Sequence, residues 1–249
     1  MEWRAGARGW DDSPVALDFS DRVALVAGGT GALGRAVSLA FLEAGATVAV
    51  SHRRPSELDA LRAAAGPAAA RLSGDTVDVT AETPVRSWIE GVRNRHGRLD
   101  VLVNCVGAYA GGAKLWDADA KVLDDMLSLN LRSGWVLARA AAPGMVAAGG
   151  GAIVNVASRA ALVHGAGEAA YAASKAAALA LFESLAAELK GTGVRVNSIL
   201  PSIIDTEANR KAMPKSDFAK WPKPEEIARV ILFLCSDDAK LVHGAAIPV

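Results

Sequence analysis

The sequence predicts an α/β fold, a doubly wound parallel sheet with helices on both faces, and three observations support this prediction. Short segments rich in valine, isoleucine and leucine alternate with longer segments whose apolar residues recur at helical spacing. The short segments are apolar almost throughout, as expected for parallel strands that are covered on both faces. The chain of 249 residues has no internal linker long enough to divide it. We therefore expect a single domain over residues 20–249, preceded by a flexible tail of residues 1–19.

The expected elements follow in order from residue 22, with a helix after almost every strand. The first strand, 22–29, is β-branched and ends in glycines, and the helix at 34–45 stops at Gly45. Segment 117–148 forms either one long helix or two short ones. The helix at 168–190 carries alanines on several faces, which permits close helix packing and supports an oligomer. The other strands are expected at 47–51, 75–80, 99–107, 152–158 and 194–202, and the other helices at 56–65, 82–96 and 224–236.

The composition excludes several classes of protein. The 27 basic residues balance the 27 acidic ones, which argues against a nucleic acid or an anionic membrane surface as a partner. Two cysteines are too few for a disulfide scaffold, and their surroundings suggest no metal site. No apolar run approaches the roughly 18 residues of a membrane span, and the N-terminus lacks the apolar stretch of a secretory signal. We therefore expect a soluble, cytoplasmic protein.

A glycine-rich loop joins the first expected strand to the first expected helix. It reads Ala-Gly-Gly-Thr-Gly-Ala-Leu-Gly over residues 27–34. Glycines permit a tight turn and a close approach of the backbone to a pyrophosphate, and the free amides at a helix start bind such an anion. The alternative is a loop that merely turns, but its place in the first strand–loop–helix unit favours binding. The expected dinucleotide contacts in this loop are Gly28, Thr30, Gly31, Leu33 and Gly34.

The end of the second expected strand carries basic residues at the point where a dinucleotide fold contacts the adenosine ribose. An acidic residue there accepts a hydrogen bond from the 2′-hydroxyl of NAD, whereas a basic residue favours the 2′-phosphate of NADP. The chain reads Ser51-His52-Arg53-Arg54 and has no carboxylate until Glu57. We therefore predict NADP as the preferred cofactor and NAD as the alternative, with contacts from His52 and Arg53. The competing interpretation is that the two arginines only begin a surface loop.

A tyrosine and a lysine lie four residues apart on the helix expected at 168–190, which places Tyr171 and Lys175 on one face. An ammonium near a phenol favours the phenolate and lowers the tyrosine pKa from about 10. Such a tyrosine donates a proton to a carbonyl oxygen or accepts one from an alcohol. Ser158 ends the strand before this helix, at the sheet edge where ligands bind, so its hydroxyl is placed to hold the same oxygen.

Together these motifs resemble those of the short-chain dehydrogenase/reductase family over residues 20–249. The resemblance implies a Rossmann-type fold and a catalytic tetrad in which Tyr171 is the acid and base. Lys175 would hold the nicotinamide ribose and lower the tyrosine pKa, Ser158 would orient the substrate oxygen, and Asn130 would hold a water that links Lys175 to a proton relay. The segments that carry the resemblance are 27–34, 78–80, 97–107, Asn130, 153–158, 171–175 and 194–202.

The same resemblance implies further cofactor contacts at the ends of the other strands. Those near the adenine are Asp78 and Val79, those behind the ribose are Asn104, Val106 and Gly107, and those on the nicotinamide side are Pro201, Ile204 and Thr206, besides Tyr171 and Lys175 themselves. The chain departs from the family pattern at several positions. Ala27 and Ala32 replace the usual threonine and second glycine of the loop, and Cys105-Val106 replaces an asparagine–alanine pair. None of these changes touches a proton-transfer residue, so an active enzyme is expected.

Two segments also resemble dihydropteridine reductase, a branch of the same family: residues 107–116 and residues 200–221. Both are expected to form the substrate pocket and its lid. We therefore predict an NAD(P)(H)-dependent oxidoreductase that reduces a carbonyl to an alcohol, with reduction of a quinonoid pterin as the alternative. A third possibility is a dinucleotide-binding sensor or scaffold without catalysis. The expected partners are a small-molecule substrate and further copies of the chain, in a homodimer or a homotetramer.

Overall fold

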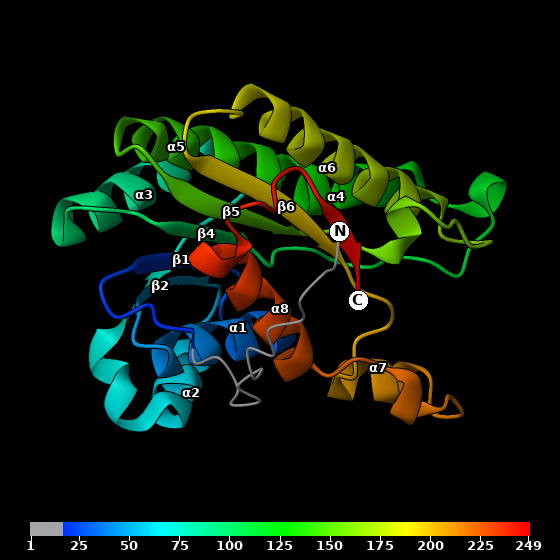
Figure 1. The fold of residues 1–249 in the computed structure, drawn as a ribbon. Coiled ribbons are helices and arrows are strands. Elements are labelled where there is room, and N and C mark those ends of the chain that lie inside the picture. The colour runs from blue at the N-terminus through cyan, green and yellow to red at the C-terminus, as the bar shows by residue number, and fades with distance from the viewer. Residues whose placement is uncertain (1–16) are drawn as a thin grey trace, which may run out of the picture.

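Seven parallel strands form one sheet in the computed structural model, which describes residues 17–249 (Figure 1). The strand order is β3-β2-β1-β4-β5-β6-β7, and every neighbouring pair is parallel. The predicted doubly wound parallel sheet is thereby confirmed. The strands are β1 (Val23–Ala27), β2 (Thr47–His52), β3 (Leu72–Thr76), β4 (Val101–Asn104), β5 (Gly151–Val156), β6 (Val194–Leu200) and β7 (Ala246–Pro248).

Helices cover both faces of the sheet because successive residues of a central strand point to opposite sides. In β1, Ala24 and Val26 face one core while Val23 and Leu25 face the other, and all four are buried. Both faces of β1 are therefore apolar, which explains its unbroken apolar run. The first core is covered by α1 (Ala32–Glu43), α2 (Pro55–Ala65) and α8 (Pro224–Cys235), and the second by α3 (Glu82–His96), α5 (Ser133–Ala147) and α6 (Ala169–Glu188) (Figure 1).

The sheet changes its winding direction at β1, which pairs with β2 on one side and with β4 on the other. The connections after β1 and β4 therefore leave toward opposite faces. In doubly wound sheets a ligand binds in the crevice that this divergence opens at the carboxyl ends of the strands. The glycine loop follows β1 and residues 105–119 follow β4, so both line this edge of the sheet.

Some boundaries differ from those expected. The third strand was expected at 75–80, but β3 spans Leu72–Thr76. It therefore begins three residues and ends four residues earlier than expected. Val77 and Val79 are apolar because they pack against the second core after the strand has ended. Segment 117–148 contains α4 (Ala120–Met126), a π-helical segment (Leu127–Arg132) and α5 in succession.

Two short elements lack a clear sequence signal. Strand β7 has three residues, all partly or fully exposed, at the edge of the sheet. Helix α7 (Glu207–Ala212) buries no residue and so shows no apolar stripe.

The predicted tail of residues 1–19 lies mostly outside the described residues. Of its last residues, Phe19 is buried, with its ring centroid 5.0 Å from that of Phe41 in an edge-to-face contact. Ordered packing therefore begins before residue 20. Within residues 17–249, every helix is too short or too polar to cross a membrane.

Candidate active site

The glycine loop leaves β1 and turns directly into α1. Gly28 has a φ of +71°, a value that favours glycine, and its amide donates to the Ser51 hydroxyl at 2.9 Å. A side chain at Gly34 would overlap the carbonyl oxygen of Gly28, so the loop requires glycine there. Gly31 caps the helix without a side-chain acceptor, which leaves amides of the first turn to bind an anion. This cradle fits the pyrophosphate of a dinucleotide.

The end of β2 lies next to this loop. His52 is 7% exposed, and its Nδ1 has no hydrogen-bond partner among residues 17–249. Arg53 is exposed. Arg54 instead pairs with Glu57 in the first turn of α2. Of the two arginines after β2, only Arg53, the expected contact, makes no ion pair in the described part of the chain, because Arg54 is engaged by a carboxylate three residues away.

The segments after β3 and β4 supply the next group of expected cofactor residues. Asp78 is exposed and accepts hydrogen bonds from the amide and the hydroxyl of Thr80, which lower the pKa of its carboxyl. Asn104 is buried and donates to Asn155 on β5 at 3.0 Å, while its Oδ1 accepts from the amide of Val106 at 3.2 Å. These bonds hold the turn after β4 against the sheet. A Cβ built on Gly28 would lie 3.4 Å from Val106 and Cys105, so this turn touches the glycine loop.

Asn130 lies in the π-helical segment between α4 and α5, and π-helical turns are frequent at functional sites. Its side chain is 2% exposed. Its Oδ1 accepts from the amide of Ala108 at 2.9 Å, and its Nδ2 donates to the carbonyl of Ala108 at 3.0 Å and to the Ser174 hydroxyl at 2.9 Å. Ser174 in turn donates to the carbonyl of Tyr171. Asn130 therefore ties the turn after β4 to the first part of α6.

Lys175 lies on α6 one helical turn after Tyr171 and is 5% exposed. Its Nζ donates to the carbonyl of Val156, the last residue of β5, at 3.0 Å. Burial disfavours the ammonium and lowers the pKa of Lys175 to about 8. A Cβ built on Gly107 would lie 2.9 Å from Asn130 Oδ1 and 3.0 Å from Lys175 Nζ. The two side chains thus meet the backbone at Gly107, where only glycine leaves them room.

Tyr171 and Ser158 complete the group at the carboxyl edge. Burial raises the pKa of Tyr171 above its usual value, and the hydrogen bond with Ser158 opposes that shift. Lys175 is not among the causes of this shift, because its ammonium is directed at Val156, and burial of the phenol prevails. The lowering of the Tyr171 pKa by Lys175 therefore stays a prediction. The Ser158 oxygen accepts from the amide of Ala160 at 3.1 Å and keeps its hydroxyl hydrogen for another partner.

The loop after β6 contains the last expected cofactor residues and the expected lid. Pro201 is buried, Ile204 is partly buried, and Thr206 caps α7 by accepting from the amide of Asn209. Side chains in and around α7 brace the expected lid. Arg210 pairs with Asp205 and stacks on the ring of Phe218 at 4.9 Å, and Phe218 contacts Trp221 at the same centroid distance.

Two residues near the site were not expected as functional candidates. The ring of Tyr109, which is 65% exposed, packs edge-on against that of Tyr171 with 4.9 Å between centroids. It lies in segment 107–116, which was expected to form part of the substrate pocket, although Tyr109 itself was not singled out. Glu57 was noted only as the first carboxylate after β2, yet it reaches back to Thr30 in the glycine loop at 3.1 Å.

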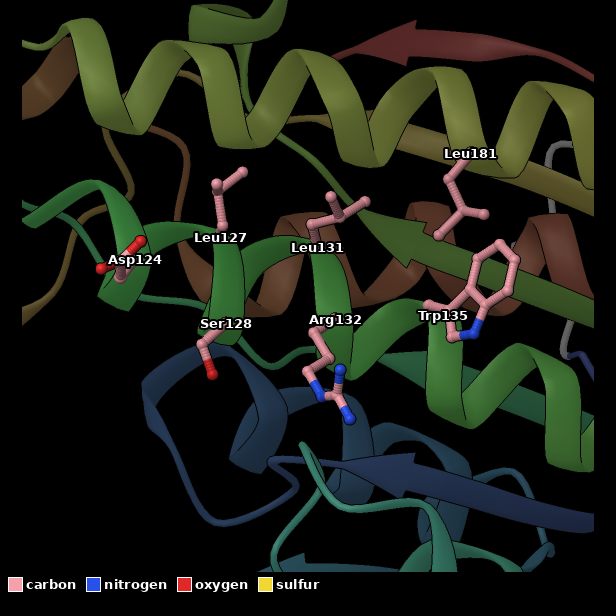
Figure 2. A pocket seen from close by; sticks show the side chains of 7 residues that line it. All are labelled: Asp124, Leu127, Ser128, Leu131, Arg132, Trp135 and Leu181. Carbon is pink, nitrogen blue, oxygen red and sulfur yellow. The ribbon is translucent and has the colours of Figure 1, made fainter. Parts of the chain in front are cut away.

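A separate groove of about 630 Å³ lies where α4, the π-helical segment and the start of α5 face α6, and it includes no expected site residue. Figure 2 shows Leu127 and Leu131 directed toward α6 and Trp135 lying beneath Leu181. Trp135 is 53% exposed although it is large and apolar. The groove is lined by Asp124, Leu127, Ser128, Leu131, Arg132, Trp135 and Leu181.

Comparisons with known proteins agree with this geometry. The family model for short chain dehydrogenases matches residues 22–217. D-threitol dehydrogenase of Mycolicibacterium smegmatis is 36% identical over 93% of this chain and 94% of its own length. The 3-oxoacyl-(acyl-carrier-protein) reductase FabG of Thermotoga maritima is 31% identical over 94% of this chain and 98% of its own length.

Solved structures match the fold over almost the whole chain. A short-chain type dehydrogenase/reductase from Mycobacterium ulcerans has a TM-score of 0.88 and 29% identity, covering 94% of this chain and 90% of that one. The structure of ElxO with NADP bound has a TM-score of 0.87 and 25% identity, covering 92% of this chain and 96% of that one.

Proposed function

This chain belongs to the short-chain dehydrogenase/reductase family, and on that premise we propose that it is an NAD(P)(H)-dependent oxidoreductase that reduces the carbonyl group of a small molecule to an alcohol. One observation carries the proposal. Asn130 and Lys175 meet at the Gly107 turn, which touches the glycine loop. Tyr171 lies one helical turn before Lys175 on α6, and its phenol is hydrogen-bonded to Ser158. An anion cradle and a proton-donating phenol thus share one edge of the sheet.

The proposed roles follow from the state of each group. The phenol of Tyr171, whose pKa lies above its usual value, is protonated near neutral pH, as a proton donor in the reduction direction must be. The Ser158 hydroxyl donates to the substrate oxygen and holds it near that phenol. A bound nicotinamide cofactor supplies the hydride that the carbonyl carbon accepts, while the carbonyl oxygen takes the proton of Tyr171. Lys175 would hold the ribose of the bound cofactor, and Asn130 would hold a water that links Lys175 to the relay from which Tyr171 regains its proton.

NADP is the cofactor we propose as preferred, with NAD as the alternative. The support is Arg53, exposed at the end of β2 beside the glycine loop, where a guanidinium pairs with a 2′-phosphate. A similar fold with NADP bound, ElxO, is consistent with this preference. The residues proposed to cradle the dinucleotide are those of the glycine loop, His52, Arg53, Asp78, Val79, Asn104, Val106, Gly107, Pro201, Ile204 and Thr206.

We also propose that the chain forms a homodimer or a homotetramer through the groove of Figure 2. An exposed tryptophan beside leucines is the kind of apolar surface that association buries. Light scattering of the purified protein at several concentrations measures the assembly directly. A monomer throughout would contradict this part of the proposal.

The experiment for the main proposal is a titration of the protein with NADPH and NADH, followed by a turnover panel of ketones, quinones, 3-oxoacyl thioesters and quinonoid dihydropterin. Tight NADPH binding with turnover of a ketone or thioester supports the proposal. NADH preference with pterin turnover would instead favour the second candidate, whose support is the braced lid at Asp205, Arg210 and Phe218. Cofactor binding without turnover of any compound would favour a sensor.

A further inference from the structure

Glu57 joins two segments that meet at the proposed cofactor site. It lies in the first turn of α2, and one carboxylate oxygen accepts from the Thr30 hydroxyl of the glycine loop at 3.1 Å. The other accepts from Nε and Nη2 of Arg54, the Nε bond measuring 2.9 Å. Thr30 follows β1 and Arg54 follows β2, and these strands are paired neighbours. One carboxylate therefore bridges the ends of two adjacent strands.

The hydrogen bonds of the bridge keep the Glu57 carboxylate ionised at this edge of the sheet. The hydrogen bond from Arg54 is the largest cause that lowers the pKa of Glu57, and Thr30 adds to it, so the carboxylate stays ionised at neutral pH. Arg54 is engaged in the ion pair with Glu57, whereas Arg53 forms no ion pair within residues 17–249. The charges at this edge are therefore the Arg54–Glu57 ion pair, which is neutral as a whole, and the unpaired cation of Arg53.

In this fold the adenosine ribose lies between the glycine loop and the end of β2. The 2′-substituent of that ribose is therefore expected on the side of the loop where Glu57 contacts Thr30 and where Arg53, directly after β2, is exposed. A 2′-hydroxyl is a hydrogen-bond donor that a carboxylate tolerates or accepts. A 2′-phosphate carries about two negative charges, which an ionised carboxylate repels while Arg53 attracts them.

We propose that Glu57 is a specificity-determining residue that weakens binding of the 2′-phosphate and keeps this protein able to use both NADP(H) and NAD(H). The inference rests on the proposed dinucleotide function. In it, Arg53 supplies the attraction for the phosphate and Glu57 limits it, by repulsion and by holding Arg54 and the Thr30 hydroxyl. The alternative is that Glu57 only stabilises the start of α2 through its charge and its pair with Arg54.

The chain offers a matched control for that alternative. Asp59 lies on the same helix and pairs with Arg62 at 3.5 Å with the same three-residue spacing. In the described part of the chain it makes no hydrogen bond or ion pair with the glycine loop. Removing its charge changes helix electrostatics to a similar extent but leaves the bridge intact. An effect that Glu57→Gln produces and Asp59→Asn does not therefore belongs to the bridge.

The test measures equilibrium binding of NADPH, NADH, 2′,5′-ADP and 5′-AMP to the full chain, without any substrate. Removing one charge beside a doubly charged phosphate in a water-like medium predicts a change on the order of ten-fold. Glu57→Gln is expected to tighten NADPH and 2′,5′-ADP by about that factor while NADH and 5′-AMP change by less than about three-fold. Glu57→Asp, which keeps the charge, is expected to restore most of the original ratio.

Three outcomes are informative. A selective gain for the 2′-phosphate ligands in Glu57→Gln but not in Asp59→Asn supports the inference. Equal NADPH-to-NADH ratios in the wild type, Glu57→Gln and Asp59→Asn overturn the role of Glu57 and leave the proposed function standing. Failure of the wild-type protein to bind either dinucleotide overturns the proposed function and this inference together. Circular dichroism of each variant confirms that α2 is retained.

Discussion

The cluster around Asn130 and Lys175 and the bridge around Glu57 lie at the same edge of the sheet but are held in different ways. The cluster is buried, and backbone groups of Ala108 and Val156 anchor both side chains. The bridge is partly exposed and consists of side chains that hold one another. The residues proposed for proton transfer are thus fixed by backbone groups of the fold, whereas the proposed cofactor choice depends on exposed charged side chains.

The energetics of the two regions follow from this difference. Removing one partner of a buried, hydrogen-bonded charge leaves the other unsatisfied, at a cost of about 1–3 kcal/mol or more. Exposed ion pairs contribute only about 0–1 kcal/mol. Substitutions in the cluster should therefore damage activity and stability together. Those in the bridge and in the lid should change binding while the fold survives.

Lys175→Met is expected to give the largest effect, a loss of kcat of at least about 100-fold in carbonyl reduction, because the variant lacks the buried ammonium that is proposed to hold the ribose and the proton path.

Lys175→Met should also alter the pH dependence of stability. The pKa of Lys175 is about 8 in the folded protein, below its unfolded value, so the unfolded state binds more protons between that pH and about 10.4. This group therefore makes the wild-type protein more stable as pH rises through that window.

Urea unfolding of the wild type and Lys175→Met at pH 7.5 and at pH 10 measures this contribution as a difference between the proteins. The rise should be larger in the wild type. An equal pH response in the two proteins would show that Lys175 is not buried as an ammonium with a lowered pKa.

Gly107→Ala is expected to cost about 1–3 kcal/mol of unfolding free energy, because the added methyl would lie 2.9 Å from Asn130 Oδ1 and 3.0 Å from Lys175 Nζ. We expect a fall in kcat of about 10–100-fold as the two side chains move apart. Gly91→Ala is the matched control, since Gly91 lies in α3 with no atom within 4 Å of the new methyl. That change should stabilise the protein by up to about 1 kcal/mol. Equal behaviour of the two variants in thermal unfolding would contradict the close approach at Gly107.

Arg210→Ala is expected to give the smallest effect. It removes the pair with Asp205 and the stacking on Phe218, which together brace the lid from its exposed side. The KM of the substrate should rise about three- to ten-fold while kcat and unfolding stability stay nearly unchanged. Lys220→Ala, which breaks the exposed pair with Asp217, serves as the control and should leave KM unchanged. A fall in kcat without a change in KM would place Arg210 in the proton-transfer machinery instead.

The same contrast explains what the sequence reveals. Motifs that depend on the backbone were predictable. Gly28 has a positive φ and Gly34 has no room for a side chain, so both positions require glycine. The four-residue spacing of Tyr171 and Lys175 places them on one face of a helix. Helix α3 was predicted to the residue because Gly97, with a φ of +75°, ends it sharply. By contrast, β7 and α7 bury almost nothing, so no apolar period marks them.

Contacts between side chains from distant parts of the chain could not be predicted from the sequence. The spacing of Tyr171 and Lys175 could not show that the ammonium is directed at Val156 and that burial raises the tyrosine pKa. The reach of Glu57 back to Thr30 depends on how α2 is seated beside β1, which no local pattern encodes. The positions of these residues along the strands and helices were therefore easier to predict than the charge state or partner of each group.

The most direct test of the proposed mechanism is rapid mixing of the protein–NADPH complex with a ketone that the wild type reduces, in the wild type and in Tyr171→Phe. The wild type should oxidise its bound NADPH in a single fast phase and release the alcohol. Tyr171→Phe should bind NADPH with the same affinity and oxidise it about 100- to 10,000-fold more slowly. Oxidation at the wild-type rate in Tyr171→Phe would contradict the assignment of Tyr171 as the proton donor and, with it, the central claim.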